Sequence, residues 1–149
     1  MDQRPTRYFG AAVLLGALAL VNTVWFRHDA FSTAVAVVLY LLILIVAFSG
    51  GRFARRLHRR ASWLGALIGA LFGIIAGLGS FLMHDTARDI QVPSKGLARI
   101  KLVELANSPT AHIVVILTAM LTFAVLSLIM ASLAAITAKD TPEKRTESA

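Results

Sequence analysis

The chain has 149 residues, of which 57% are hydrophobic, and its mean hydropathy of +0.72 is too high for one soluble domain of this size, so we expect an integral membrane protein. It contains no cysteine, which excludes disulfides, cysteine-ligated zinc, iron–sulfur clusters and thiol catalysis. The net charge of +7 comes from Lys and Arg residues that flank the apolar runs instead of forming a separate basic domain, so we expect no nucleic-acid binding.

Two apolar runs near the N-terminus, at about 8–26 and 30–49, predict the first pair of membrane helices. The first run also has the basic start and small residues of a signal peptide, but it stays apolar beyond Ala17–Ala19, so we expect a retained helix. Only residues 27–29 separate the two runs. One continuous helix would be about 60 Å long, twice the ~30 Å hydrocarbon core, and would bury charges at its middle. The sequence therefore predicts a tight helical hairpin.

A segment with arginines at helical spacing follows the second run. We expect Gly50-Gly51 to end the second helix. The arginines of the next segment, RFARRLHRRA, fall at offsets 0, 3, 4, 7 and 8, which is one face of a helix. They are Arg52, Arg55, Arg56, Arg59 and Arg60. A short amphipathic helix in the membrane interface would let them contact anionic lipid headgroups, and a plain basic loop that sets the topology fits the sequence equally well.

The third apolar run, at about 62–83, has a glycine at every fourth position. These glycines, which share one face of a helix, are Gly65, Gly69, Gly73 and Gly77. In water each would cost about 1 kcal/mol relative to alanine, whereas in lipid small residues at this spacing promote close helix packing. We therefore predict a glycine-zipper helix that another helix approaches closely.

Residues 84–107 form the one substantial polar connection, which we expect to be an outward loop. Its segment LARIKLVELA favours a short helix, and the alternative is a strand hairpin around the turn-like PSKG sequence. Asn107-Ser108-Pro109 then has the pattern of a helix start, with a capping side chain before proline in the first turn.

The fourth apolar run extends over about 109–138 and repeats the four-residue spacing of small residues. Ser127, Ala131 and Ala135 make this helix the expected partner of the glycine face, and we favour packing within one chain over packing between chains. Residues 1–138 are thus expected to form a single four-helix membrane domain. Residues 139–149 mix charges with Ser, Thr and Pro, which predicts a disordered cytoplasmic tail.

The distribution of Lys and Arg predicts the orientation. With four spans, the N-terminus, the 50–61 segment and the C-terminal tail share one side and hold ten of the fifteen Lys and Arg residues. The positive-inside rule then places both termini in the cytoplasm. We expect a multi-pass, N-in/C-in protein of the cytoplasmic (inner) membrane, in a bacterium.

Four polar residues are predicted near the outward ends of the helices. His28, His84, Asp85 and His112 lie at about the same predicted depth, and such groups bind divalent metals or, for paired histidines, haem. The interpretation that we favour is that they are interface residues at helix ends, because ligand spacing across loops specifies no site. We expect no metal and no cofactor.

The four predicted helix interiors contain no charged residue, which disfavours a proton-coupled or ion-coupled transporter. No catalytic set has credible spacing, so we expect no enzyme activity. The function that we favour is an accessory, scaffold or regulatory subunit of a membrane complex, which acts through close helix packing with a membrane-protein partner or a second copy of itself. The alternatives are an oligomeric channel or uncoupled small-solute transporter and, third, a haem- or quinone-associated membrane anchor subunit.

Overall fold

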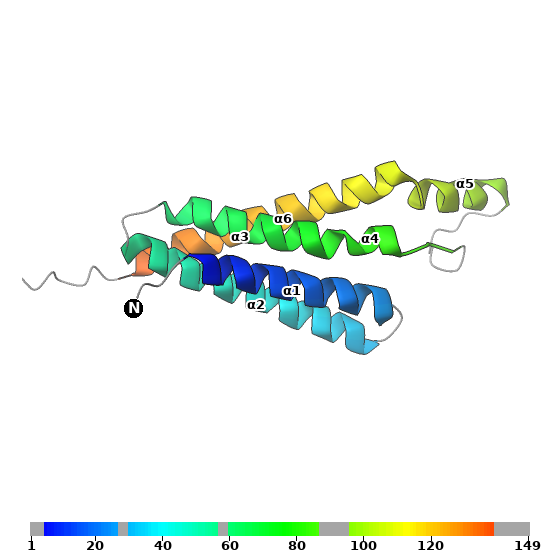
Figure 1. Cartoon of the computed structure of the whole chain (residues 1–149). Helices are drawn as coiled ribbons and strands as arrows, with labels where there is room; N and C mark the ends of the chain where they lie inside the picture. Colours follow the sequence, from blue (N-terminus) through cyan, green and yellow to red (C-terminus); the bar gives the residue numbers. More distant parts are fainter. Residues whose placement is uncertain (1–4, 27–29, 57–59, 87–95, 139–149) are drawn as a thin grey trace, which may run out of the picture.

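The computed structural model describes residues 5–26, 30–56, 60–86 and 96–138, and every regular element in these ranges is a helix. The helices, shown in Figure 1, are α1 (Thr6–Trp25), α2 (Ala30–Arg56), α3 (Ala61–Gly77), α4 (Gly79–Leu82), α5 (Leu97–Ala106) and α6 (Pro109–Thr137). The predicted tail at 139–149, His28 and Arg59 lie outside the described residues.

Four stretches of helix are long and apolar enough to cross a membrane: Thr6–Trp25, Phe31–Arg56, Ala61–Leu82 and Pro109–Thr137. The prediction of an all-helical protein with four candidate spans is thereby confirmed. Large apolar side chains cover the outside of the spans, with Leu41 and Leu121, for example, 56% and 58% exposed. Such a surface fits a lipid environment better than water, so length and composition together identify a multi-pass membrane protein.

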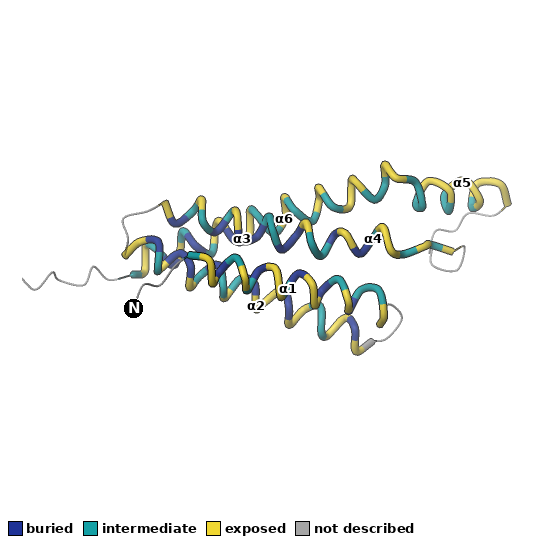
Figure 2. The backbone as a smooth tube through the Cα atoms, in the orientation of Figure 1, coloured by how far each residue is buried: buried dark blue, intermediate teal, exposed yellow. Residues whose placement is uncertain are grey.

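The four spans alternate in direction, so that α3 and α6 are antiparallel (Figure 1). Both α2 and α3 contact α1 and α6, whereas α1 and α6 make no contact with each other in the described parts of the chain. Buried residues line the inward sides of the helices (Figure 2). The hydrophobic core consists of Tyr8, Ala12, Ala19, Leu39, Ile43, Ala47, Ile68 and Phe72.

Helix α2 continues through the glycine pair that was expected to end it. It ends at Arg56. Gly50 and Gly51 do not form a turn, because they lie inside the helix and allow neighbouring helices to approach closely. A Cβ at Gly51 would clash with the backbone of Ala131 in α6, and one at Gly50 would lie 3.2 Å from Cδ1 of Ile68 in α3. At 1.5 Å per residue the 27-residue helix is about 40 Å long, so its last turns extend past a ~30 Å hydrocarbon core.

Helix α1 also packs through small side chains. Ala12, Gly16 and Ala19 are buried, and a Cβ at Gly16 would lie 2.9 Å from Cβ of Ile75 in α3. Near the end of α1, the buried Asn22 side chain donates a hydrogen bond from Nδ2 to the carbonyl oxygen of Ser32, near the start of α2, at 3.0 Å. This bond satisfies a polar group that would be costly to leave unpaired in lipid, and it joins α1 to α2 next to their connection.

The expected third helix is interrupted once. Leu78 separates α3 from the short α4, and the N–H of Phe81 bonds to the Leu78 carbonyl oxygen at 3.1 Å, three residues back. Gly77 and Gly79 flank this tightened turn, which is consistent with the low helix propensity of glycine.

The prediction of a short helix in LARIKLVELA is confirmed, because α5 spans this segment and none of its residues is buried. The predicted start of α6 is also confirmed. Oγ of Ser108 accepts a hydrogen bond from the N–H of Ala111 at 3.2 Å, and Pro109 occupies the first turn.

Candidate functional site

The glycines of α3 lie against the backbone of α6 along the whole length of the helix. A Cβ at Gly65 would lie 2.5 Å from the carbonyl oxygen of Ser127, and one at Gly73 would lie 2.6 Å from that of Ala119. A Cβ at Gly69 would clash with the carbonyl oxygen of Phe123, and at Gly77 the nearest atom would be Cα of Ile116, 2.9 Å away. Real Cβ atoms are not found this close to backbone, so all four positions require glycine at the present helix separation.

The facing side of α6 uses Ser127 and Ala131, both fully buried. Ala135, the third predicted residue, is half-buried, and its neighbour Ala134 is buried. A helix has 3.6 residues per turn, so a strict spacing of four drifts about 40° per step. This drift carries Ala135 partly out of the buried face of α6.

The hydroxyl groups of α6 fall into three kinds. Oγ of Ser132 donates to the carbonyl oxygen of Leu128 at 2.8 Å, as is usual for hydroxyl groups within membrane helices. Oγ of Ser127 is buried beside Gly69 and has no hydrogen-bond partner among the described residues. Thr118 and Thr122, in contrast, are exposed on the outside of the bundle. Both are candidates to line a path between copies of the chain.

An aromatic cluster joins α2, α3 and α6 near the middle of the spans. The ring centroids of Phe72 and Phe123 are 4.7 Å apart in an edge-to-face arrangement, and that of Tyr40 lies 5.0 Å from Phe123. Such pairs add about 0.5–1.5 kcal/mol beyond the burial of their area. The cluster therefore supports the close helix packing next to Gly69 and Gly73.

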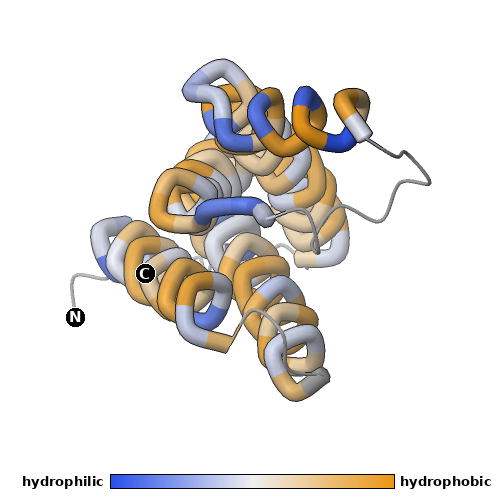
Figure 3. The backbone as a smooth tube through the Cα atoms, turned by 90° about the vertical axis from the view of Figure 1, so that its right-hand side faces the viewer, coloured by the Kyte–Doolittle hydropathy of each residue, from blue (hydrophilic) through white to orange (hydrophobic). Residues whose placement is uncertain are grey.

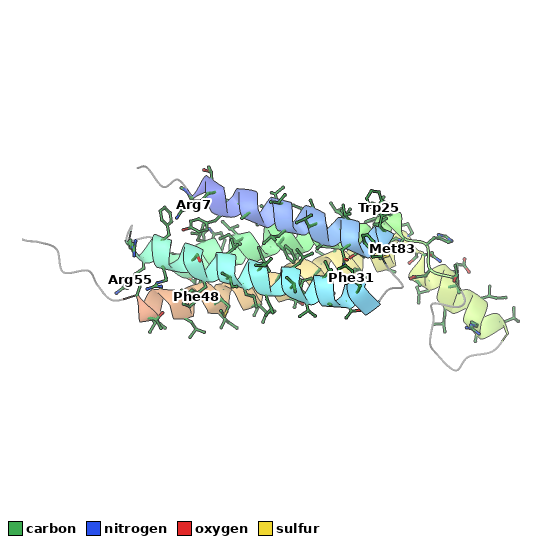
Figure 4. All side chains as sticks on the ribbon, turned by 90° about the horizontal axis from the view of Figure 1, so that it is seen from below. Arg7, Trp25, Phe31, Phe48, Arg55 and Met83 are labelled. Atoms are coloured by element: carbon green, nitrogen blue, oxygen red, sulfur yellow. The ribbon has the colours of Figure 1, made fainter. Side chains whose placement is uncertain are left out.

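Arginine side chains gather at the end of the bundle where α1 and α3 begin and α2 and α6 end, which we call the arginine end. Figure 4 shows Arg7 and Arg55 there. The Arg7 guanidinium lies 4.7 Å from the ring centroid of Tyr8 and donates to its hydroxyl oxygen at 2.6 Å. The predicted lipid-contacting residues Arg52, Arg55, Arg56 and Arg60 are exposed.

Of the predicted metal candidates, His84, Asp85 and His112 lie within the described residues and His28 does not. In the described ranges, no three His, Asp or Glu side chains are close enough to hold a metal ion. The imidazole of His112 instead packs on the ring of Phe81, with centroids 4.9 Å apart. His84 and Asp85 belong to the segment that follows α4.

A groove of about 660 Å³ lies at the opposite end of the bundle, between α5 and the segment after α4. We call it the α5 groove; the described residues that line it are His84, Gly96, Arg99, Ile100, Val103, Glu104 and Asn107. Figure 3 looks along the bundle from this end and shows that α5 alternates hydrophilic and hydrophobic turns, unlike the mainly hydrophobic spans. The sequence pattern does not indicate this groove, because α5 lacks one continuous apolar face.

The side chain of Asn107 fixes one wall of the α5 groove. Its Oδ1 accepts a hydrogen bond from the N–H of Asp85 at 2.7 Å, and its Nδ2 donates to the Asp85 carbonyl oxygen at 2.8 Å. Nδ2 also donates to the carbonyl oxygen of Val103 at 2.9 Å. The segment after α4 is thereby held to the junction of α5 and α6.

Replacing Asn107 with alanine should release this clamp. Each lost hydrogen bond is worth about 0.5–1.5 kcal/mol, so we expect the Asp85 amide to exchange with solvent at least about tenfold faster. Hydrogen exchange followed by mass spectrometry measures this rate. Protection in the middle of α3 should stay unchanged, and an unchanged rate at Asp85 would show that the clamp does not hold the segment.

No family model, curated protein or solved structure matches this chain.

Proposed function

We propose that the protein is an accessory or scaffold subunit of a membrane complex and that the outer face of α6 contacts the partner. The observation that carries the proposal is the contrast between the two sides of α6. One side of α6 packs against the glycines of α3. In the apolar 18-residue stretch of α6, however, only 6% of the residues are buried, whereas 39% are buried in the corresponding stretch of Ala61–Leu82. Close packing holds α6 firmly while it leaves most of its length available to another membrane protein.

The chemistry of the spans supports a structural role over transport or catalysis. From Ala61 to Met83 and from Ile113 to Thr137 the sequence has no ionisable side chain. Coupled transporters and redox anchors use such groups within the bilayer. The bundle offers mainly apolar packing and a few hydroxyl groups.

The arginine end supports the proposed orientation. Arg52, Arg55 and Arg56 lie on the last turns of α2, beyond the length needed to cross a ~30 Å core. At a cytoplasmic surface each would gain about 1 kcal/mol near anionic headgroups. We therefore propose that the arginine end is cytoplasmic and contacts anionic lipid.

The proposal predicts a partner that is lost when the outer face of α6 is changed. Affinity-tagged protein extracted in mild detergent from its native membrane should bring down a membrane protein in fixed stoichiometry. Leu121→Trp should reduce the recovered partner by about tenfold or more, because a bulky side chain in a packed interface costs about 1–3 kcal/mol. Leu41→Trp on α2 is the matched control, since the two leucines are 58% and 56% exposed.

Purification of a monomer with no stoichiometric partner would contradict the proposal, and so would equal recovery from both tryptophan variants. A second copy of the chain as the recovered partner would identify a self-associating scaffold. The second candidate function is an oligomeric channel, favoured by the exposed hydroxyl groups of Thr118 and Thr122. Solute flux through liposomes that contain only the purified protein, reduced by Thr118→Val and Thr122→Val, would favour that candidate.

A further inference from the structure

The α5 groove lies where the spans leave the apolar part of the bundle. Exposed Trp25 and Phe31 mark this end together with Met83 (Figure 4), and exposed aromatic side chains are typical of the membrane–water interface. His84, the next residue after Met83, is the first to line the groove. The groove therefore opens at the depth of lipid headgroups.

Helix α5 is suited to the same depth. Leu97 and Ile100 are 77% and 63% exposed, and they alternate with Arg99 and Lys101 along a ten-residue helix. Exposed apolar side chains next to basic ones are characteristic of segments that lie at the headgroup boundary. This environment supplies lipid at high local concentration to the groove beside α5.

The lining of the groove combines two opposite charges with an apolar wall. Arg99 provides a guanidinium, whose planar N–H donors match phosphate oxygens, and this group has five donors, so a contact within the chain leaves others for a ligand. Glu104, five residues further along α5 and also part of the lining, provides a carboxylate that suits an ammonium group. Ile100 and Val103 provide apolar surface between them.

We propose that the α5 groove binds the headgroup of a zwitterionic phospholipid of the phosphoethanolamine type. The phosphate lies at Arg99, the ammonium lies at Glu104, and the glycerol ester region contacts Ile100 and Val103. The volume of about 660 Å³ falls within the range of small-molecule sites. An anionic headgroup without an ammonium would satisfy Arg99 but would leave Glu104 unpaired beside a negative charge. This site is separate from the proposed partner contact on α6.

The test uses purified full-length protein, delipidated in a nonionic detergent. Native mass spectrometry measures binding of short-chain phosphatidylethanolamine, short-chain phosphatidylglycerol and free phosphoethanolamine. We expect the first to bind at least about tenfold more tightly than either of the others. The lipid tail accounts for the preference over free phosphoethanolamine, and Glu104 accounts for the preference over phosphatidylglycerol.

Two variants of α5 assign the groups. Arg99→Gln should weaken phosphatidylethanolamine binding at least about tenfold, whereas Lys101→Gln, an exposed cation that does not line the groove, should leave it within about twofold. Glu104→Gln should remove the preference over phosphatidylglycerol. Circular dichroism and thermal unfolding check that each variant keeps the fold.

Three results would overturn the inference. Equal loss of binding in the Arg99 and Lys101 variants would show that the lipid is attracted by the positive charge of α5 in general and not by Arg99 in particular. Equal affinity for the two lipids in the unmodified protein would exclude the role of Glu104. Equal affinity for free phosphoethanolamine and for the lipid would show that the groove binds a soluble phosphate compound. Because the assay uses the isolated protein, none of these results depends on whether a partner protein exists.

Discussion

Gly69→Ala is expected to destabilise the bundle by about 1–3 kcal/mol, although alanine is the better helix former by about 1 kcal/mol. The added Cβ would clash with the carbonyl oxygen of Phe123 and would lie 2.6 Å from Oγ of Ser127. The first of these atoms belongs to the backbone, so α3 and α6 can relieve the clash only by moving apart. Gly69→Leu should prevent the two helices from packing at all.

Gly10→Ala provides the control for Gly69→Ala, because nothing lies within 4 Å of a Cβ built at Gly10. This variant should be neutral or slightly more stable. Unfolding in a fixed lipid–detergent mixture, followed by circular dichroism as denaturant is added, compares the two variants. If both substitutions had the same effect, the close approach of α3 and α6 would not contribute to stability.

Gly51→Ala should also destabilise the protein by about 1–3 kcal/mol, whereas the same change at its neighbour Gly50 should have little effect. At Gly51 the added Cβ would lie 2.6 Å from Cα of Ala131 and closer still to its carbonyl oxygen. At Gly50 the nearest atom is Cδ1 of Ile68, 3.2 Å away at the end of a side chain that can rotate. The gain in helix propensity of about 1 kcal/mol offsets that small repulsion.

This pair of variants distinguishes two roles for the glycines. If α2 ended at Gly50-Gly51, both alanine variants would disturb a turn and would destabilise the protein to a similar extent. If α2 continues to Arg56 and packs on α6, only Gly51→Ala should do so. The same unfolding measurement separates the two cases.

The four spans could be predicted from the sequence because each depends on a local property, the length of an apolar run. The start of α6 was predictable for the same reason, since Ser108 and Pro109 determine it over a few residues. The end of α2 was not, because a glycine pair has two uses. A glycine pair ends a helix when water or a turn follows it. A helix can also continue through the pair where a second helix approaches, as α6 does here at Ala131.

The candidate site was predictable in part. The four-residue spacing of glycines indicates a face for close packing, and the structure places that face against Ser127 and Ala131 of the same chain. The deeper burial of Ala134 than of Ala135 depends on helix drift and on the crossing of helices, which the sequence of α6 alone does not contain. The α5 groove depends on Asn107 bonding to Asp85, 22 residues earlier, and no local pattern encodes that pairing.

The most direct test of the central claim asks whether α6 of the same chain covers the glycine face of α3. The chain has no cysteine, so an introduced pair has no background. A Cβ at Gly77 would lie 3.5 Å from Cβ of Ile116, within the range that a disulfide requires. The double variant Gly77→Cys, Ile116→Cys should form a disulfide within one chain on mild oxidation, detected by mass spectrometry of the monomer. Gly10→Cys with Ile116→Cys should form none, since α1 and α6 make no contact in the described structure. Disulfide-linked dimers without the disulfide inside one chain would contradict the account, because they would show that the glycine face meets α6 of a second copy.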